Sequence, residues 1–274
     1  MTWYGRVFRK KYEKAAQHSI RGFMRHNDSN HVAELTAICL EAADPERARQ
    51  LMRFFKTGVG QYGYGDQFLG LPSASFVRSL IKPFVGKFTL DDCSRLLDSP
   101  WHEIRMAALQ IMVESAKRML KQRDLAGLTE LAALYDERLE RANNWDLVDV
   151  SVYYIMGAYW NCANTKTDER RRCLQKWAES GNLWRERASI VATLALIRQG
   201  ILEDTFWLSE YFLSHPHDLM HKACGWMLRE AGKKDLEALR GFLAIFYKRL
   251  PRTALRYAIE RMEPAERKKW MEKA

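Results

Sequence analysis

Apolar residues recur at intervals of three and four along most of the chain, which is the spacing of one face of an α-helix. The pattern is clearest in the segments 46–56, 103–122 and 125–142. The alternation of apolar and polar residues between turn signals that indicates β-strands is not convincing anywhere. Proline is scarce, with 7 residues in 274, so few helices would be interrupted. The sequence therefore predicts an all-α protein.

Two polar pairs mark the expected starts of helices. Asp44 and Pro45 stand directly before the segment 46–56, as an N-cap residue and a first-turn proline. Thr89 and Asp92 resemble a capping box in which aspartate replaces the usual glutamate. Both pairs predict a helix that begins at the following residue.

One segment is different, because it is rich in glycine. The stretch GVGQYGYGDQFLGLP (58–72) contains a literal G-x-G-x-x-G in Gly58, Gly60 and Gly63. A dinucleotide-binding turn needs a preceding β-strand, whereas the residues before this stretch have a helical pattern. We therefore interpret 57–72 as a long loop between helices and expect no nucleotide cofactor.

Five segments share a common design. Each opens with a turn or capping residue, continues with an aromatic or bulky residue and a charged residue, and ends in small and apolar residues. The segments are SPWHEIRMAAL (99–109), NNWDLVDVSVYY (143–154), GNLWRERASIVATL (181–194), HPHDLMHKACGWML (215–228) and RLPRTALRYAIERM (249–262). Arg187, Lys222 and Arg256 repeat at intervals of about 35 residues, the length of a helical-repeat unit.

Helical pairs of this period indicate an α-solenoid of HEAT-like repeats. A single pair cannot bury its apolar stripe, so neighbouring pairs must stack. We predict one domain over 1–274, helical from about 5 to 272. We expect it to be C-shaped, with the second helix of each pair lining a basic concave groove.

The repeat places a group of aromatic and charged residues on that concave face. Its members are Trp145, Asp149, Trp184, Arg187, Lys222, Trp226 and Arg229. Asp149 follows Trp145 by four residues, so both lie on one helix face. A carboxylate on an apolar helix requires a positive partner. Arg187 could be that partner in a structural ladder between repeats, or a cationic ligand could be.

Other residues of these types have simpler interpretations. Trp160, Trp177 and Trp207 are interpreted as core residues, as tryptophans in repeat helices usually are. His215, His217 and His221 could suggest a metal, but no carboxylate or cysteine of the sequence pattern completes a ligand set, so we predict none.

The charge balance favours a polyanionic partner. The chain has 44 basic and 34 acidic residues, a net charge of +10, which favours nucleic acid first and an anionic membrane second. Its 5 cysteines are odd in number and form no C-x-x-C pair, as expected in a reducing cytosol. The charged N-terminus lacks the core of a signal peptide, and no apolar run is long enough to span a membrane. We expect a cytoplasmic protein.

Four motifs of the chain, in the same order, resemble those of the bacterial DNA alkylation repair enzymes of the AlkD type, which are HEAT-like-repeat DNA glycosylases. FFKTGVGQYGYGDQFLGL (54–71) resembles the family signature FFKTGPGQYGEGDxFLGV, with Val59 and Tyr64 as departures. The other three are NNWDLVD (143–149), NLWRERASIV (182–191) and HKACGWMLREAGK (221–233). The resemblance covers essentially the whole chain.

The resemblance implies a role for each matching residue. Asp149 matches the catalytic carboxylate, Trp145 and Trp226 match the tryptophans that flank the lesion, and Arg187 matches an arginine that contacts phosphate. We expect Lys222 and Arg229 to hold DNA phosphates as well. Arg187 close to Asp149 would keep the carboxylate ionised.

The implied function is a monofunctional glycosylase that removes 3-methyladenine and 7-methylguanine from duplex DNA and so begins base excision repair. It would act as a monomer at the nucleoid, without a cofactor. Two alternatives stay open on the residues alone. One is a non-catalytic binder of damaged or branched DNA, and the other is a HEAT-type protein–protein scaffold.

Overall fold

Helices form where the apolar spacing predicts them. The structure is a computed structural model, and it describes residues 30–273, so the expectations for the N-terminus lie outside the described residues. The first half contains α2 (Asn30–Glu41), α3 (Pro45–Phe54), α4 (Ala74–Ile81), η1 (Lys82–Phe84), α5 (Leu90–Leu97), α6 (His102–Gln122), α7 (Leu125–Arg138), η2 (Leu139–Arg141) and α8 (Trp145–Asp149). The second half contains α9 (Val152–Ala163), α10 (Thr167–Ala178), α11 (Leu183–Ala192), α12 (Leu194–Arg198), α13 (Glu203–Tyr211), α14 (Asp218–Lys234), α15 (Leu236–Phe246), α16 (Arg252–Ala258) and α17 (Pro264–Lys273).

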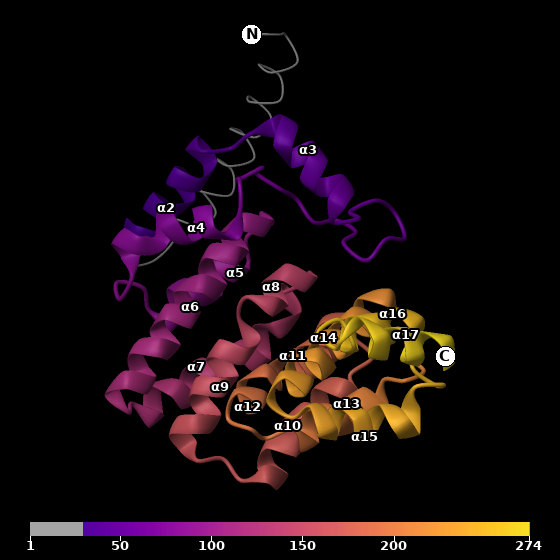
Figure 1. Ribbon diagram of the computed structural model, residues 1–274. Helices are drawn as coiled ribbons and strands as arrows, with labels where there is room; N and C mark the ends of the chain where they lie inside the picture. The colour runs from indigo at the N-terminus through magenta and orange to yellow at the C-terminus, as the bar shows by residue number, and fades with distance from the viewer. Residues whose placement is uncertain (1–29, 274) are drawn as a thin grey trace.

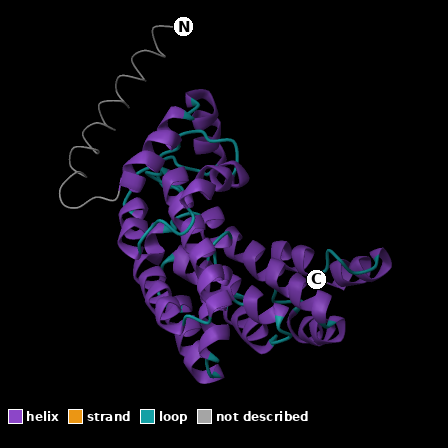
Figure 2. Cartoon of the chain, turned by 90° about the vertical axis from the view of Figure 1, so that its left-hand side faces the viewer, coloured by secondary structure: helices purple, strands orange, loops and turns teal. Residues whose placement is uncertain are grey.

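The all-α prediction is confirmed. Figure 2 shows helices joined by loops, and no β-strand occurs within residues 30–273. An isolated parallel bridge between Gln67 and Trp101 is the nearest approach to sheet structure in the same residues.

Both predicted helix starts are confirmed. The Asp44 carboxylate accepts the backbone N–H groups of Glu46 and Arg47 at 3.0 and 3.1 Å. Thr89 and Asp92 form a reciprocal capping box at the start of α5. The end of α3 differs from the prediction, because the helix stops at Phe54 rather than at residue 56. Lys56 adopts a left-handed backbone with φ of 55°, which cannot continue a helix.

The five predicted repeat segments open a row of neighbouring helices, which we call the motif helices: α6, α8 with α9, α11 with α12, α14 and α16. Successive motif helices pack on each other, α6 on α9, α9 on α11, α11 on α14 and α14 on α16. Helices α7, α10, α13 and α15 alternate with them along the chain (Figure 1). This is the stacking expected of an α-solenoid of helical repeats.

Two motif helices are interrupted where the sequence predicted continuous ones. Ser151 lies between α8 and α9, and its hydroxyl donates to the carbonyl of Leu147 at 2.6 Å. Thr193 lies between α11 and α12 and donates in the same way to Ile190 at 2.7 Å. Hydroxyls that bond back to the preceding turn compete with the helical pattern and bend helices. The break after Asp149 therefore follows from Ser151.

The core runs along the whole row of helices. One apolar cluster extends from Val32 in α2 to Ala231 in α14, and a second surrounds α14, α15 and α16. Trp160 and Trp177 are buried in the first cluster, as predicted. Trp207 differs, because it is only half-buried and carries the guanidinium of Arg171 at 5.9 Å from its ring centroid.

The glycine-rich segment is an ordered loop held by the first turn of α6. The Glu103 carboxylate accepts the backbone N–H groups of Leu69, Gly70 and Leu71 at 2.8, 2.8 and 3.1 Å. The His102 amide donates to the carbonyl of Gln67 at 2.7 Å. The interpretation as an inter-helix loop is confirmed, and α3 rather than a strand precedes it.

Candidate functional site

Helix α8 carries two of the predicted site residues, Trp145 and Asp149. Asn144 caps it by accepting the Trp145 amide at 3.0 Å, and Leu147 and Val148 face the core with 0% exposure. Trp145 and Asp149 are left on the half-buried side. Placement of these residues on one face follows from their spacing of four.

Asp149 forms a bidentate ion pair with Arg187 of α11. The guanidinium Nε and Nη2 donate to the two carboxylate oxygens at 2.9 and 2.7 Å. The carboxylate side chain is 16% exposed and the arginine side chain 5%. The structure therefore joins the two residues that the repeat pattern placed in neighbouring helices, and the Asp149 side chain keeps some exposure to solvent.

Arg187 is held on a third side as well. Its Nη1 donates to the carbonyl of Leu219 in α14 at 2.6 Å, so the guanidinium ties α8, α11 and α14 together. Burial raises the pKa of the Asp149 carboxyl above its usual range, and the charge and hydrogen bonds of Arg187 oppose that shift. Because Arg187 is enclosed in this way, its main role is to position the Asp149 carboxylate. Little of its guanidinium is accessible to a phosphate.

Trp145 lies in an aromatic cluster at the end of α3. Its ring stacks on Phe55, with centroids 5.4 Å apart and planes at 20°, and meets the edge of Phe54 at 6.1 Å. Trp184 of α11 is buried, and its ring meets Tyr62 of the glycine-rich loop edge-on at 6.0 Å. Loop residues therefore reach the candidate site, which the sequence pattern did not indicate.

Trp226 of α14 has other neighbours than Trp145. It is half-buried and no ring contact joins it to Trp145 in the part of the chain that the structure describes. It borders a cavity of about 410 Å³ whose other lining residues are Tyr153, Leu194, Ile197, Arg198, Glu230, Lys233 and Lys234. The guanidinium of Arg198 lies 4.8 Å from the Tyr153 ring centroid, within the range of a cation–π contact. Neither Tyr153 nor Arg198 belongs to the predicted site residues.

The two further predicted cations have different surroundings. The Lys222 side chain is 41% exposed and pairs with Asp218 one turn earlier at 2.7 Å. Arg229 is 19% exposed and pairs with Glu260 of α16. Lys222 is therefore accessible to a ligand, whereas Arg229 is turned toward the next motif helix.

A buried charge network lies beside the site and was missed by the sequence analysis. His102 of α6 bridges Asp66 of the loop at 2.8 Å and Asp146 of α8 at 2.9 Å. Arg105 contacts the other oxygen of Asp66 at 2.5 Å. We call Asp66, His102, Arg105 and Asp146 the loop clamp.

The loop clamp is charged. Burial alone lowers the pKa of His102, but Asp146 and Asp66 outweigh it and raise the pKa to about 9. Burial likewise raises the pKa of Asp66, and His102 with Arg105 outweighs it and lowers that pKa. The sequence signal for the loop clamp was the segment WHEIR (101–105). It places three ionisable residues in an otherwise apolar helix start.

Each of the three histidines near α14 forms a hydrogen bond to another group of the protein. His215 contacts Glu186 at 3.1 Å, His221 contacts the carbonyl of His215 at 2.6 Å, and His217 caps α14. Within the described residues no group of three or more His, Cys, Asp or Glu side chains could hold a metal ion. All five cysteines are free.

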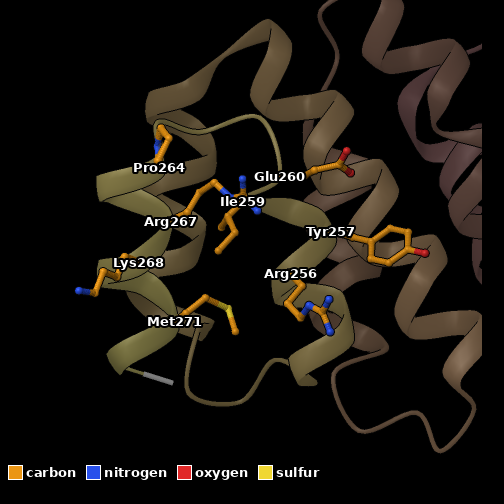
Figure 3. Close-up of a pocket in the computed structure, with 8 residues that line it drawn as sticks. All are labelled: Arg256, Tyr257, Ile259, Glu260, Pro264, Arg267, Lys268 and Met271. Atoms are coloured by element: carbon orange, nitrogen blue, oxygen red, sulfur yellow. The ribbon is translucent and has the colours of Figure 1, made fainter.

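A second cavity, of about 580 Å³, lies between α16 and α17 (Figure 3). Arg256 and Tyr257 line it from α16, and Arg267 and Met271 line it from α17. Asp149 and Trp145 do not border it, so this cavity is separate from the candidate site.

The comparisons with known proteins identify the family. The model of the family described as DNA alkylation repair enzyme matches residues 39–262, and the chain belongs to this family. It is also similar to a solved structure described as a predicted DNA alkylation repair enzyme from Enterococcus faecalis, with a TM-score of 0.59 and 16% identity. That match covers 81% of this chain and 97% of the other, and it shows a common fold. No curated protein matches.

Helices of membrane-spanning length and apolarity are not present among the described residues.

Proposed function

We propose that the protein is a DNA glycosylase that hydrolyses the N-glycosidic bond of cationic alkylated purines, 3-methyladenine and 7-methylguanine, in duplex DNA. The observation that carries the proposal is Asp149, a partly exposed carboxylate fixed at 2.7 and 2.9 Å by Arg187, four residues from Trp145. Membership of the DNA alkylation repair family supports alkylated DNA as the substrate.

Cationic lesions need little help from a general acid. Adenine methylated at N3 and guanine methylated at N7 carry a positive charge, so the base leaves as a neutral molecule with the electron pair of the C1′–N bond. What remains is to stabilise the positive charge that develops on the sugar and to deliver water to C1′. A fixed negative charge at the sugar supplies the first of these.

Asp149 would perform both tasks. Its charge faces the oxocarbenium-like sugar, and an oxygen orients the attacking water and takes its proton as the new C1′–O bond forms. The products are a free methylated base and an abasic site. Arg187 acts through Asp149, because its bidentate contact fixes the carboxylate and opposes the rise in pKa that burial causes.

The aromatic residues would select the charged lesion. Trp145 presents a half-buried indole beside Asp149, and an indole face attracts a cationic base. Trp226 lies with Arg198, Lys233 and Lys234 around its cavity, where it would contact the same duplex farther along. Lys222 and these basic residues would bind phosphates in a basic groove on the concave side of a C-shaped solenoid. Arg229 and Arg187 would contribute less, since both are engaged in ion pairs.

No step of this mechanism needs a metal, a nucleotide cofactor or a covalent lysine adduct. The protein would act as a monomeric, monofunctional glycosylase on the nucleoid. The reaction it begins is base excision repair, since an abasic site must be processed further.

The test is to incubate the protein with methylated duplex DNA and measure free 3-methyladenine and 7-methylguanine, with Asp149→Asn as the comparison. The proposal expects release by the wild type and a loss of at least 100-fold in the variant, the size of effect that removal of one electrostatic contact to a transition state produces. DNA binding without base release would identify a non-catalytic binder. Failure to bind DNA at all would identify a scaffold.

A further inference from the structure

Helix α8, which carries Asp149, has only five residues. A helix of that length gains too little from its own backbone hydrogen bonds to be stable alone, so its direction is set by the groups that anchor it. At its start, Asp146 bonds to His102 of the loop clamp at 2.9 Å. At its end, beside Asp149, the anchor is a hydrogen bond between Ser151 and Tyr135 of α7.

The two hydroxyls form a chain of hydrogen bonds with a fixed direction. The Ser151 Oγ lies 2.6 Å from the carbonyl oxygen of Leu147 and 2.8 Å from the hydroxyl of Tyr135. A carbonyl oxygen can only accept, so the single hydroxyl proton of Ser151 is directed to the preceding turn. The phenol of Tyr135 must therefore donate to Ser151. Burial raises the pKa of Tyr135, so the phenol keeps its proton and remains a donor.

This chain of hydrogen bonds is closed to water. Tyr135 is 1% exposed, and Ser151 and Leu147 are buried completely. The Tyr135 ring belongs to the main apolar cluster, and α7 packs against α9, the helix that begins directly after Ser151 (Figure 1). Water cannot replace a partner that is lost in such surroundings, so the bond from the fixed phenol holds the Ser151 hydroxyl firmly.

The turn that Ser151 closes contains Asp149. Leu147 stands two residues before Asp149 and Ser151 stands two residues after it, so the hydroxyl bond spans the backbone from which the carboxylate extends. The carboxylate meets Arg187 of α11 by two bonds, of 2.9 and 2.7 Å. A bidentate contact has a narrow geometry, so a looser turn would shift the carboxylate against an arginine that other groups hold in place.

The equivalent break between α11 and α12 lacks such an anchor. Thr193 donates to the carbonyl of Ile190 at 2.7 Å, in the same way as Ser151. Within residues 30–273, however, no second side chain bonds to the Thr193 hydroxyl. The phenol bond is therefore particular to the break that follows Asp149.

We propose that Tyr135 and Ser151 are positioning residues for Asp149, because their buried hydrogen bond fixes the turn that directs the carboxylate toward Arg187. The inference deepens the proposed function and rests on it. Neither residue would touch the substrate, so both act through the carboxylate. Displacement of a catalytic group lowers the rate of reaction more than it lowers binding of the substrate.

The variant Tyr135→Phe tests the proposal, because it removes the phenol oxygen and keeps the ring. Thr193→Val is the matched control, because it removes one buried hydroxyl from the equivalent break. Both are compared with the wild type at a temperature where all three are folded. The first measurement gives kcat and KM for release of 3-methyladenine and 7-methylguanine from methylated duplex DNA.

The second measurement needs neither DNA nor activity. Hydrogen exchange of the Arg187 Nε–H group, which donates to Asp149, is followed by NMR in the free protein. The signal is assigned by its absence in Arg187→Lys. Exchange of this group reports directly how firmly the carboxylate is held.

Tyr135→Phe should lower kcat about tenfold and leave KM within about twofold of the wild type. The same variant should speed exchange of the Arg187 Nε–H about tenfold, whereas Thr193→Val should leave both quantities within about twofold. Ser151→Ala should act in the same direction as Tyr135→Phe. The double variant Tyr135→Phe/Ser151→Ala should lose no more than Ser151→Ala alone, since both residues act through one bond.

An unchanged kcat in Tyr135→Phe overturns the positioning role, whether or not exchange becomes faster. Equal losses in Thr193→Val overturn it too, because they would show a general loosening of the motif helices. Additive losses in the double variant would show that the two residues act separately. In each case base release by the wild type leaves the proposed function intact, and a wild type that releases no base overturns both.

Discussion

Asp146 and Asp149 belong to the same five-residue helix, α8, yet the fold uses them differently. Asp146 accepts from His102 at 2.9 Å and helps to close the loop clamp around a buried imidazolium. Asp149 pairs with Arg187 of α11, and its side chain is 16% exposed, as is that of Asp146. One carboxylate therefore lies in a network that joins α6, α8 and the glycine-rich loop, and the other in a bidentate pair with a single arginine.

The difference distinguishes a structural carboxylate, Asp146, from a candidate catalytic carboxylate, Asp149. Charges in a network of several partners hold structural elements together, and the removal of one partner mainly lowers stability. A carboxylate fixed by one arginine can instead stabilise a positive charge that arrives from outside. The comparison predicts that substitutions in the loop clamp lower the free energy of unfolding, whereas substitutions at Asp149 lower the rate.

The largest expected effect on stability comes from His102→Ala. It takes one cationic partner from each of Asp66 and Asp146, while Arg105 still pairs with Asp66, at a cost of about 3–5 kcal/mol in the free energy of unfolding. Urea denaturation measures it. His31→Ala is the control, because His31 forms only a partly exposed pair with Glu34 and should cost far less. Equal losses in the two variants would contradict the loop clamp.

The pH dependence of stability should show that His102 is protonated in the folded protein. His102 has a folded pKa of about 9, above the unfolded value of 6.5, so its contribution is complete below about pH 6.5 and is lost as the pH rises through about 9. The difference corresponds to about 3 kcal/mol. Denaturation at pH 6 and pH 9.5 should show this loss in the wild type and not in His102→Gln. A wild type of constant stability over that interval would show that His102 is neutral.

Arg187→Lys should change the rate of base release rather than the fold. Lysine offers a point charge in place of the bidentate contact, so the pKa of Asp149, already raised by burial, should rise further. Because Asp149 acts as the ionised form, the acid limb of kcat/KM should move to higher pH. Arg185→Lys is the control on the same helix, since Arg185 pairs with Asp136 and Glu140. An acid limb that does not move would contradict the role of Arg187.

The smallest effect is expected at Lys222, whose side chain is 41% exposed. Lys222→Ala should weaken DNA binding a few-fold and lower the salt slope by about one, as the loss of one phosphate contact does. Arg229→Ala should change the slope less, because Arg229 is paired with Glu260. A larger change in the salt slope for Arg229→Ala than for Lys222→Ala would show that Arg229, and not Lys222, contacts the phosphate.

Local sequence signals predicted the fold well. The caps at Asp44 and Thr89 need only neighbouring residues, and both were confirmed. The repeat spacing identified where the motif helices begin, and it placed Asp149 and Arg187 on neighbouring helices. In the structure their side chains, 38 residues apart in sequence, are 2.7 Å apart. The breaks at Ser151 and Thr193 were missed because a hydroxyl bonded to its own helix leaves the apolar spacing unchanged.

The rest of the site depends on contacts that no local pattern contains. The loop clamp joins Asp66, His102 and Asp146, which are separated by 36 and 44 residues. Tyr62 meets Trp184 at 6.0 Å although the two residues lie far apart in the sequence. Arg229 had the spacing of a groove cation, but the side of α14 that it occupies faces Glu260. Which side of a helix is free is decided by its neighbours.

The most direct test of the central claim measures free 3-methyladenine and 7-methylguanine released from methylated duplex DNA by Asp149→Asn and Asp146→Asn side by side. The account predicts at least a 100-fold slower release by Asp149→Asn at temperatures where it is folded. Asp146→Asn should be less stable and yet release base at a rate within about tenfold of the wild type. Undiminished release by Asp149→Asn, or an equal loss in both variants while both are folded, would contradict the account.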